Sequence, residues 1–101
     1  MSTTAPVMST NIVRAESVVW TNLDDRVAFL CMDHDLLFEV DGVGKIVWDF
    51  LAQPRSLDEI VQHVRSIYQV DRDRCEADVM AFISRLAENG IVRQGDTAPV
   101  A

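Results

Sequence analysis

The sequence predicts an α+β, winged helix-turn-helix-like fold, in which a three-stranded antiparallel sheet is followed by three helices. Apolar runs of strand length, separated by turn residues, fill the first part of the chain, whereas apolar residues spaced three and four positions apart fill the second part. Between residues 36 and 51 one pattern gives way to the other at a Gly-containing corner. The chain has 101 residues, of which 49% are apolar, which suffices for one compact core and not for two domains.

The two ends of the chain lack these patterns. Residues 1–15 are rich in Ser, Thr, Ala and Pro, which predicts a flexible N-terminal segment, and residues 94–101 predict a flexible C-terminal tail. A folded domain is therefore expected over residues 16–93. The start has neither the basic residues nor the apolar core of a signal peptide, and no apolar run approaches membrane-spanning length, so we expect a cytoplasmic protein without a membrane partner.

Three strands are predicted in the first part of the domain. The first lies around residues 17–21 and the second over residues 27–32, joined by the turn-rich cluster 22–25. A turn at residues 33–35 leads to the third strand, residues 36–40. Because the turns are short, the strands form an antiparallel meander, whose last strand we expect at an edge of the sheet.

The third strand has the properties of a peptide-binding edge. Alternation places Leu36, Phe38 and Val40 on one face and Leu37 and Glu39 on the other. At about 3.3 Å per residue, five residues leave roughly 17 Å of unpaired backbone, long enough to pair with about five residues of an extended peptide.

The first helix is indicated by the helical spacing of its apolar residues, and the second by a capping box. The first begins near Val43, and Pro54 prevents its continuation. Ser56 and Glu59 form a capping box that opens a second helix of about thirteen residues. Trp48 lies off the apolar stripe of the first helix, so it is either an interface residue or an anchor of this helix against the sheet.

The third helix is predicted from Asp73 to Asn89, with Gly90 in the left-handed position that closes many helices. Residues 91 and 92 are expected to return to the core. Cys31 and Cys75 are far apart and outside any CxxC pair, which indicates buried free thiols.

The order and spacing of these elements resemble the PqqD-like family, also called the RiPP recognition element. The resemblance covers residues 17–93 and rests on residues 38–44, Ile46, Val47, Trp48, Leu51, Ser56, Leu57, Glu59, Ile60, Val61, Val64, Tyr68, Asp78, Val79, Phe82, Ile83, Leu86 and residues 90–92. Residues 20–27 look like the free-standing members of lasso-peptide clusters, and a Pro-Glu-Arg segment typical of the pyrroloquinoline quinone chaperone is absent.

The resemblance implies a groove between the third strand and the third helix that binds the leader of a ribosomally made precursor peptide. The candidate peptide-binding residues are Leu36, Leu37, Phe38, Glu39, Val40, Arg72, Arg74, Cys75, Glu76, Val79, Met80, Phe82, Ile83 and Leu86. Arg85 and Asp78 are further candidates for pairing with leader charges. Two alternatives stay open. Val79, Phe82 and Leu86 could instead be core residues, because an apolar stripe at helical spacing usually packs inward. The charged candidates could instead be ordinary solvent-exposed surface residues.

Catalysis by the chain is not expected. Residues 42–45 lack the spacing of a phosphate-binding loop, and no Ser or Cys lies in a nucleophile motif. Asp33, His34 and Asp35 are adjacent in a turn and His63 lies elsewhere, so we expect no metal site and no cofactor.

The predicted function is therefore non-catalytic capture of a leader peptide and its presentation to a separate modifying enzyme or leader peptidase. Two alternatives remain: a winged-helix DNA-binding transcription regulator, and a structural adaptor or dimerisation module that uses the same edge strand, through which a homodimer could form. The net charge of −7 argues against a nucleic-acid partner, because phosphate neutralisation by cations dominates such binding.

Overall fold

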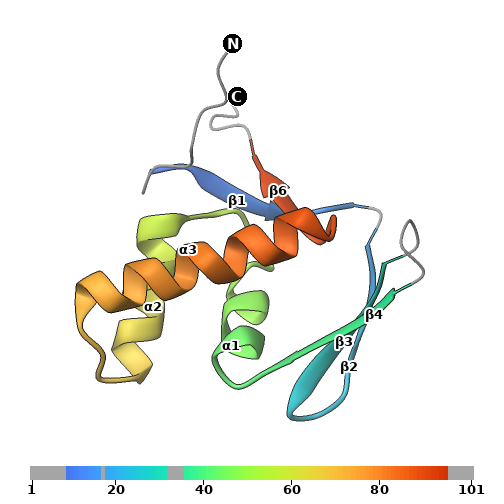
Figure 1. Cartoon of the computed structure of the whole chain (residues 1–101), viewed down its shortest axis with the longest axis horizontal. Helices are drawn as coiled ribbons and strands as arrows, with labels where there is room; N and C mark the ends of the chain where they lie inside the picture. Colours follow the sequence, from blue (N-terminus) through green and yellow to red (C-terminus); the bar gives the residue numbers. More distant parts are fainter. Residues whose placement is uncertain (1–8, 17, 32–35, 96–101) are drawn as a thin grey trace.

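The structure is a computed structural model that describes residues 9–16, 18–31 and 36–95, with the backbone alone for Cys31 and Leu36. The elements in chain order are β1 (Asn11–Arg14), β2 (Val19–Asn22), β3 (Arg26–Cys31), β4 (Leu36–Asp41), α1 (Val43–Phe50), β5 (Arg55–Ser56), α2 (Leu57–Ile67), α3 (Arg72–Glu88) and β6 (Val92–Gln94). The helices lie together on one side of the sheet formed by β2, β3 and β4 (Figure 1). The α+β prediction is confirmed, whereas the winged helix-turn-helix label stays a prediction.

The predicted meander is present as an antiparallel sheet in the order β2-β3-β4. Its register pairs Asn22 with Val27 and Arg26 with Asp41. The hairpin between β2 and β3 closes at Asp24, whose φ of 68° is tolerated by a short polar side chain. The predicted turn at residues 33–35 lies outside the described residues.

A second small sheet, in the order β5-β1-β6, was not predicted. The flexible segment expected over residues 1–15 is wrong from Asn11 onward, because β1 pairs antiparallel with both β5 and β6 and its Ile12 is buried. The predicted tail is likewise too long, since Gln94 belongs to β6 and the Gly95 N–H donates to the Asn11 carbonyl at 2.9 Å. The folded unit therefore extends beyond residues 16–93 at both ends.

The three helices form where their sequence signals place them. α2 begins at the predicted capping box, in which the Glu59 N–H donates to the Ser56 hydroxyl and the Ser56 N–H donates to the Glu59 carboxylate. α3 departs from its predicted bounds by one residue at each end, and Gly90 follows it with a φ of 74°. Ile91 and Val92 are buried, as predicted.

The core lies between the helices and the inner face of the meander. Trp48 of α1 is fully buried and makes edge-on ring contacts with Phe29 of β3 and Trp20 of β2. The Arg14 guanidinium of β1 lies 4.0 Å from the Trp48 ring and 4.8 Å from the Trp20 ring, and it donates to the Trp48 carbonyl. Trp48 is therefore an anchor of α1 against the sheet, and Arg14 links the two sheets through it.

Candidate peptide-binding site

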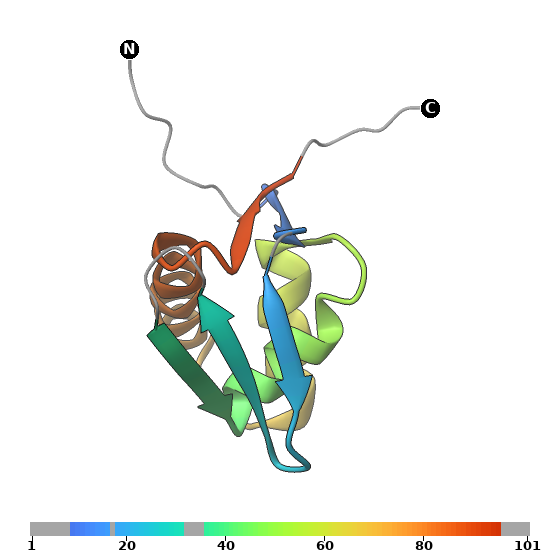
Figure 2. The same ribbon diagram turned by 90° about the vertical axis from the view of Figure 1, so that its right-hand side faces the viewer.

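The free edge of β4 is the first component of the site. Among the residues that the structure describes, β4 pairs only with β3, so the N–H and C=O groups on its other side have no strand partner. β4 lies at the α3 side of the sheet, while β2 forms the opposite edge (Figure 2). The predicted edge position of this strand is confirmed.

A shallow groove of about 270 Å³ runs along this edge. We call it the edge groove; it is lined by Phe38, Glu39, Val40, Asp41, Val43, Gly44, Phe82 and Arg85. One wall comes from β4 and the other from α3, and the start of α1 closes one end. The predicted arrangement of an edge strand facing the third helix is therefore present.

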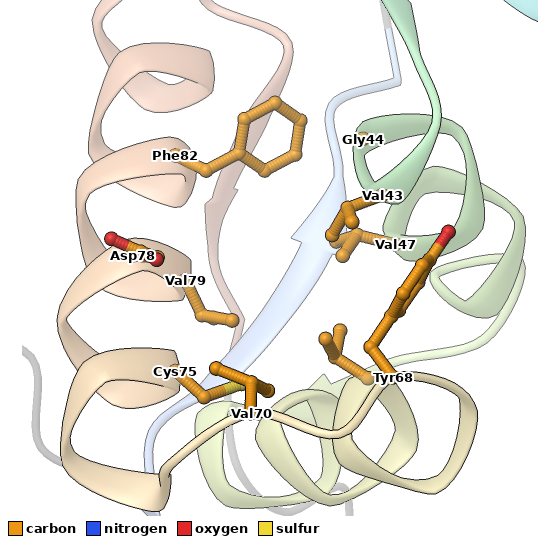
Figure 3. A pocket seen from close by; sticks show the side chains of 10 residues that line it. Val43, Gly44, Val47, Tyr68, Val70, Cys75, Asp78, Val79 and Phe82 are labelled. Carbon is orange, nitrogen blue, oxygen red and sulfur yellow. The ribbon is translucent and has the colours of Figure 1, made fainter.

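A larger and more apolar hollow of about 410 Å³ opens between the three helices. We call it the interhelical pocket; it is lined by Val43, Gly44, Val47, Val64, Tyr68, Val70, Cys75, Asp78, Val79 and Phe82 (Figure 3). Val43, Gly44 and Phe82 line both hollows, so the two are adjoining parts of one surface depression.

Gly44 is required where these two hollows meet. A Cβ atom at this position would lie 2.9 Å from the Val40 Cβ and 3.1 Å from the Phe82 Cζ. Contacts this short force neighbouring atoms to move, so the absence of a side chain lets α1 pack closely on both β4 and α3.

Arg85 supplies positive charge to the edge groove. Its guanidinium carbon lies 5.4 Å from the centre of the Phe38 ring, within the range of a cation–π contact. Phe38 in turn packs against Phe29 of the core. Arg85 therefore lies beside the inward-facing side of β4, where an added strand would pass.

The structure brings together only some of the predicted binding residues. Phe38, Glu39, Val40 and Phe82 line the edge groove, and Cys75, Val79 and Phe82 line the interhelical pocket. Leu37 is 62% exposed on the outer face of the sheet, and the side chain of Leu36 lies outside the described residues. Peptide contact by any of these residues stays a prediction.

The remaining candidates on α3 lie away from both hollows. Ile83 and Leu86 are buried core residues, and Met80 packs partly buried against the core. Arg72 forms ion pairs with Asp58 and Glu76, which raises the pKa of Arg72 through hydrogen bonds to Glu76 and then Asp58. Arg74 pairs loosely with Asp78 and is highly exposed.

Several lining residues were not predicted. Val43, Gly44, Val47, Val64, Tyr68 and Val70 come from α1, the end of α2 and the following loop. Val70 lies in the short loop between α2 and α3, so no periodicity identified it. Val43 and Tyr68 lie at helix ends and are both more than a third exposed. Each belongs to a predicted apolar stripe, and an apolar stripe residue at the end of a helix is the signal that could have identified them as lining residues.

Cys75 lies within this apolar wall as a buried free thiol, as predicted; the side chain of Cys31 lies outside the described residues. Burial raises the pKa of the Cys75 thiol, which keeps it protonated at neutral pH. Its sulfur lies 3.9 Å from the Val61 carbonyl, to which the thiol donates a weak hydrogen bond. A protonated, buried thiol is a lining group and not an activated nucleophile.

Comparison with known proteins assigns the fold to a family. Residues 29–92 match the family model described as coenzyme PQQ synthesis protein D (PqqD). The chain belongs to the PqqD family. A search of the curated proteins finds no match.

Two solved structures resemble this PqqD-family chain. One is TbiB1 in complex with the TbiA(beta) leader peptide, with 30% identity, a TM-score of 0.74, and coverage of 80% of this chain and 94% of TbiB1. The other is lasso peptide synthetase B1 complexed with the leader peptide, with 20% identity, a TM-score of 0.65, and coverage of 81% and 96%. The second shares the fold.

No helix within the described ranges is long and apolar enough to cross a membrane. In the same ranges, no three His, Cys, Asp or Glu side chains gather where they could hold a metal ion.

Proposed function

We propose that this PqqD-family protein is a RiPP recognition element that binds the leader of a ribosomally synthesised precursor peptide as an additional strand on β4. It acts in the cytoplasm without catalysis of its own, and it presents the bound precursor to a separate modifying enzyme or leader peptidase. The observation that carries the proposal is the free β4 edge, which faces the edge groove and the side chains of α3.

Strand addition accounts for affinity and selectivity separately. β4 has six residues, which correspond to about 20 Å of backbone, so an added strand gains several main-chain hydrogen bonds that do not depend on its sequence. Alternate side chains of that strand face the groove, where Phe38, Phe82 and Arg85 differ in shape and charge. These contacts would distinguish one leader from another.

Family membership supports the same function. TbiB1, which is 30% identical over most of both chains, was solved with a leader peptide bound. The present chain has a free strand edge and a flanking groove, which are the features that binding by strand addition requires.

No observation favours the DNA-binding alternative. On α3, Arg72 pairs with Asp58 and Glu76, and Arg74 lies near Asp78, so two of its three basic residues already face carboxylates. A recognition helix needs cations that remain available to phosphate.

The direct test is titration of the purified protein with a fluorescent peptide of the leader encoded beside its gene. Saturable binding is expected. N-methylation of single leader amides removes one N–H donor and leaves the side chain unchanged, so methyl groups at alternate positions of the paired segment should abolish binding, and those at the intervening positions should weaken it much less.

Absence of saturable binding would refute the proposal, and so would binding that is insensitive to N-methylation at every position. A variant with Val19→Ala is a suitable protein control, because Val19 is exposed on β2, at the opposite edge of the sheet from β4. This variant should retain wild-type affinity for the leader.

A homodimer formed through β4 would use the same edge and compete with the leader. Sedimentation velocity over a range of concentrations, with and without the leader, distinguishes the two uses. A dimer that persists at saturating leader would show that self-association does not occupy β4.

A further inference from the structure

Phe82 lies where the two hollows meet. Its side chain lines the edge groove and the interhelical pocket, and the ring extends from α3 toward Gly44 at one end of the pocket (Figure 3). Since Phe82 is partly buried against the core, one side of the ring is supported while the other faces the hollows.

The opposite side of this boundary is backbone. The Phe82 Cζ and Cε1 atoms lie 3.1 and 3.4 Å from the point where a Cβ of residue 44 would be, so the ring packs against the first turn of α1 with no side chain between them. Of the residues that line both hollows, Phe82 has the largest side chain, so its replacement changes the boundary most.

The two sides of the boundary differ in chemistry. Asp78 is the sole charged residue among the described residues that line the interhelical pocket, whereas the edge groove includes Glu39, Asp41 and Arg85. An apolar leader side chain is favoured in the interhelical pocket, and a polar or charged one is accommodated in the edge groove.

We infer that Phe82 divides the leader-binding surface into these two compartments and sets the largest side chain that the interhelical pocket accepts. The inference rests on the proposed function and adds a specificity-determining residue to it. Removal of the ring widens the connection between the two hollows, and the discrimination between leader side chains of different size should then decrease.

The test uses the leader encoded beside the gene, with Leu, Phe and Trp placed in turn at each position of the paired segment and its flanks. Wild-type protein should show one position at which Trp binds much more weakly than Leu. In the Phe82→Ala variant, the ratio of the two Kd values at that position should fall about tenfold. A ratio is used because any general loss of affinity cancels.

Phe50→Ala is the matched control, since Phe50 is a partly buried phenylalanine that lines neither hollow. It should leave the ratio unchanged. Phe82→Leu, which keeps more of the apolar packing, should give an intermediate ratio if Phe82→Ala is too unstable to measure. Circular dichroism and thermal unfolding verify that each variant is folded.

The Gly44→Ala variant should change the ratio of the Trp and Leu Kd values in the opposite direction. The added methyl group would press on the Phe82 ring and on Val40, which narrows the boundary, so the ratio should increase at the same leader position. Leader binding with an unchanged ratio in the Phe82 variants would overturn this inference and leave the proposed function intact. No binding by the wild-type protein would overturn both.

Discussion

Arg85 is the residue whose role differs most from that of its neighbours on α3. Arg72 and Arg74 lie near carboxylates at the start of the helix, whereas Arg85 lines the edge groove over Phe38. From the sequence, Arg72 and Arg74 were candidate peptide-binding residues and Arg85 was only a further candidate, because charge alone does not indicate which face of a helix meets the sheet edge.

Arg85→Ala should therefore weaken leader binding by roughly threefold to tenfold, the magnitude of one cation–π or charge contact of this kind. Arg74→Ala is the matched control and should change affinity less than twofold. Fluorescence anisotropy at two salt concentrations measures both, and equal effects of the two substitutions would show that Arg85 has no special role.

Cys75 provides a prediction about pH. Burial raises the pKa of its thiol, so the folded protein retains a proton that the unfolded chain loses more readily. The stability associated with the buried thiol is therefore complete below the ordinary thiol pKa and is lost as pH rises above it.

The Cys75→Ala variant should be less stable than wild type at pH 7, because truncation leaves a small cavity. This difference in unfolding free energy should shrink between about pH 8 and pH 10. In this range the unfolded wild-type chain ionises Cys75 while the folded protein keeps the thiol protonated, which favours unfolding of the wild type. Urea unfolding under reducing conditions tests this; a difference that is constant over this pH range would contradict it.

At the scale of elements, the helices could be predicted and the second sheet could not. α2 is defined by a capping box and an apolar stripe that both lie within residues 56–67. β1, by contrast, has four residues, and its partners β5 and β6 are shorter and lie more than forty positions away in sequence. Such a strand carries too few alternations to be identified by period, and its pairing depends on tertiary contacts.

Ile12→Ala should accordingly destabilise the protein by about 2–4 kcal/mol, since Ile12 is almost fully buried in β1. Val19→Ala, which truncates an aliphatic residue exposed on β2, should cost less than about 0.5 kcal/mol. Urea midpoints of the two variants provide the comparison. If Ile12→Ala had no effect, β1 would not belong to the stable fold.

The outline of the candidate site could also be predicted, because its main components are marked by local sequence patterns. The edge strand and the third helix are local patterns, and their juxtaposition came from the family resemblance. The lining from Val47, Val64 and Val70 depends on how α1 and α2 pack, which no spacing within one element specifies. Conversely, Ile83 and Leu86 share the helical stripe of Val79 but face the core, because a stripe does not show where the groove ends.

At the scale of the whole molecule, the charge balance separates the two classes of partner. Sixteen acidic residues against nine basic ones produce a field that repels polyanions and accelerates association with cationic peptides. No DNA complex is expected in a gel shift at low salt, and the rate of association with a basic leader should fall as salt increases. A salt-sensitive complex with DNA would contradict this prediction.

The hydrogen bond between Gly95 and Asn11 has a practical consequence for engineering. It holds the start of β1 and the end of β6 side by side, on a different sheet from the one that carries β4. A brief connector between these points could close the chain, and new ends could be opened in the hairpin at Leu23–Asp25 without cutting a helix. Circularly permuted or cyclised versions made in this way would leave the free edge of β4 unobstructed. An enzyme fused next to β1 or β6 would also leave this edge accessible.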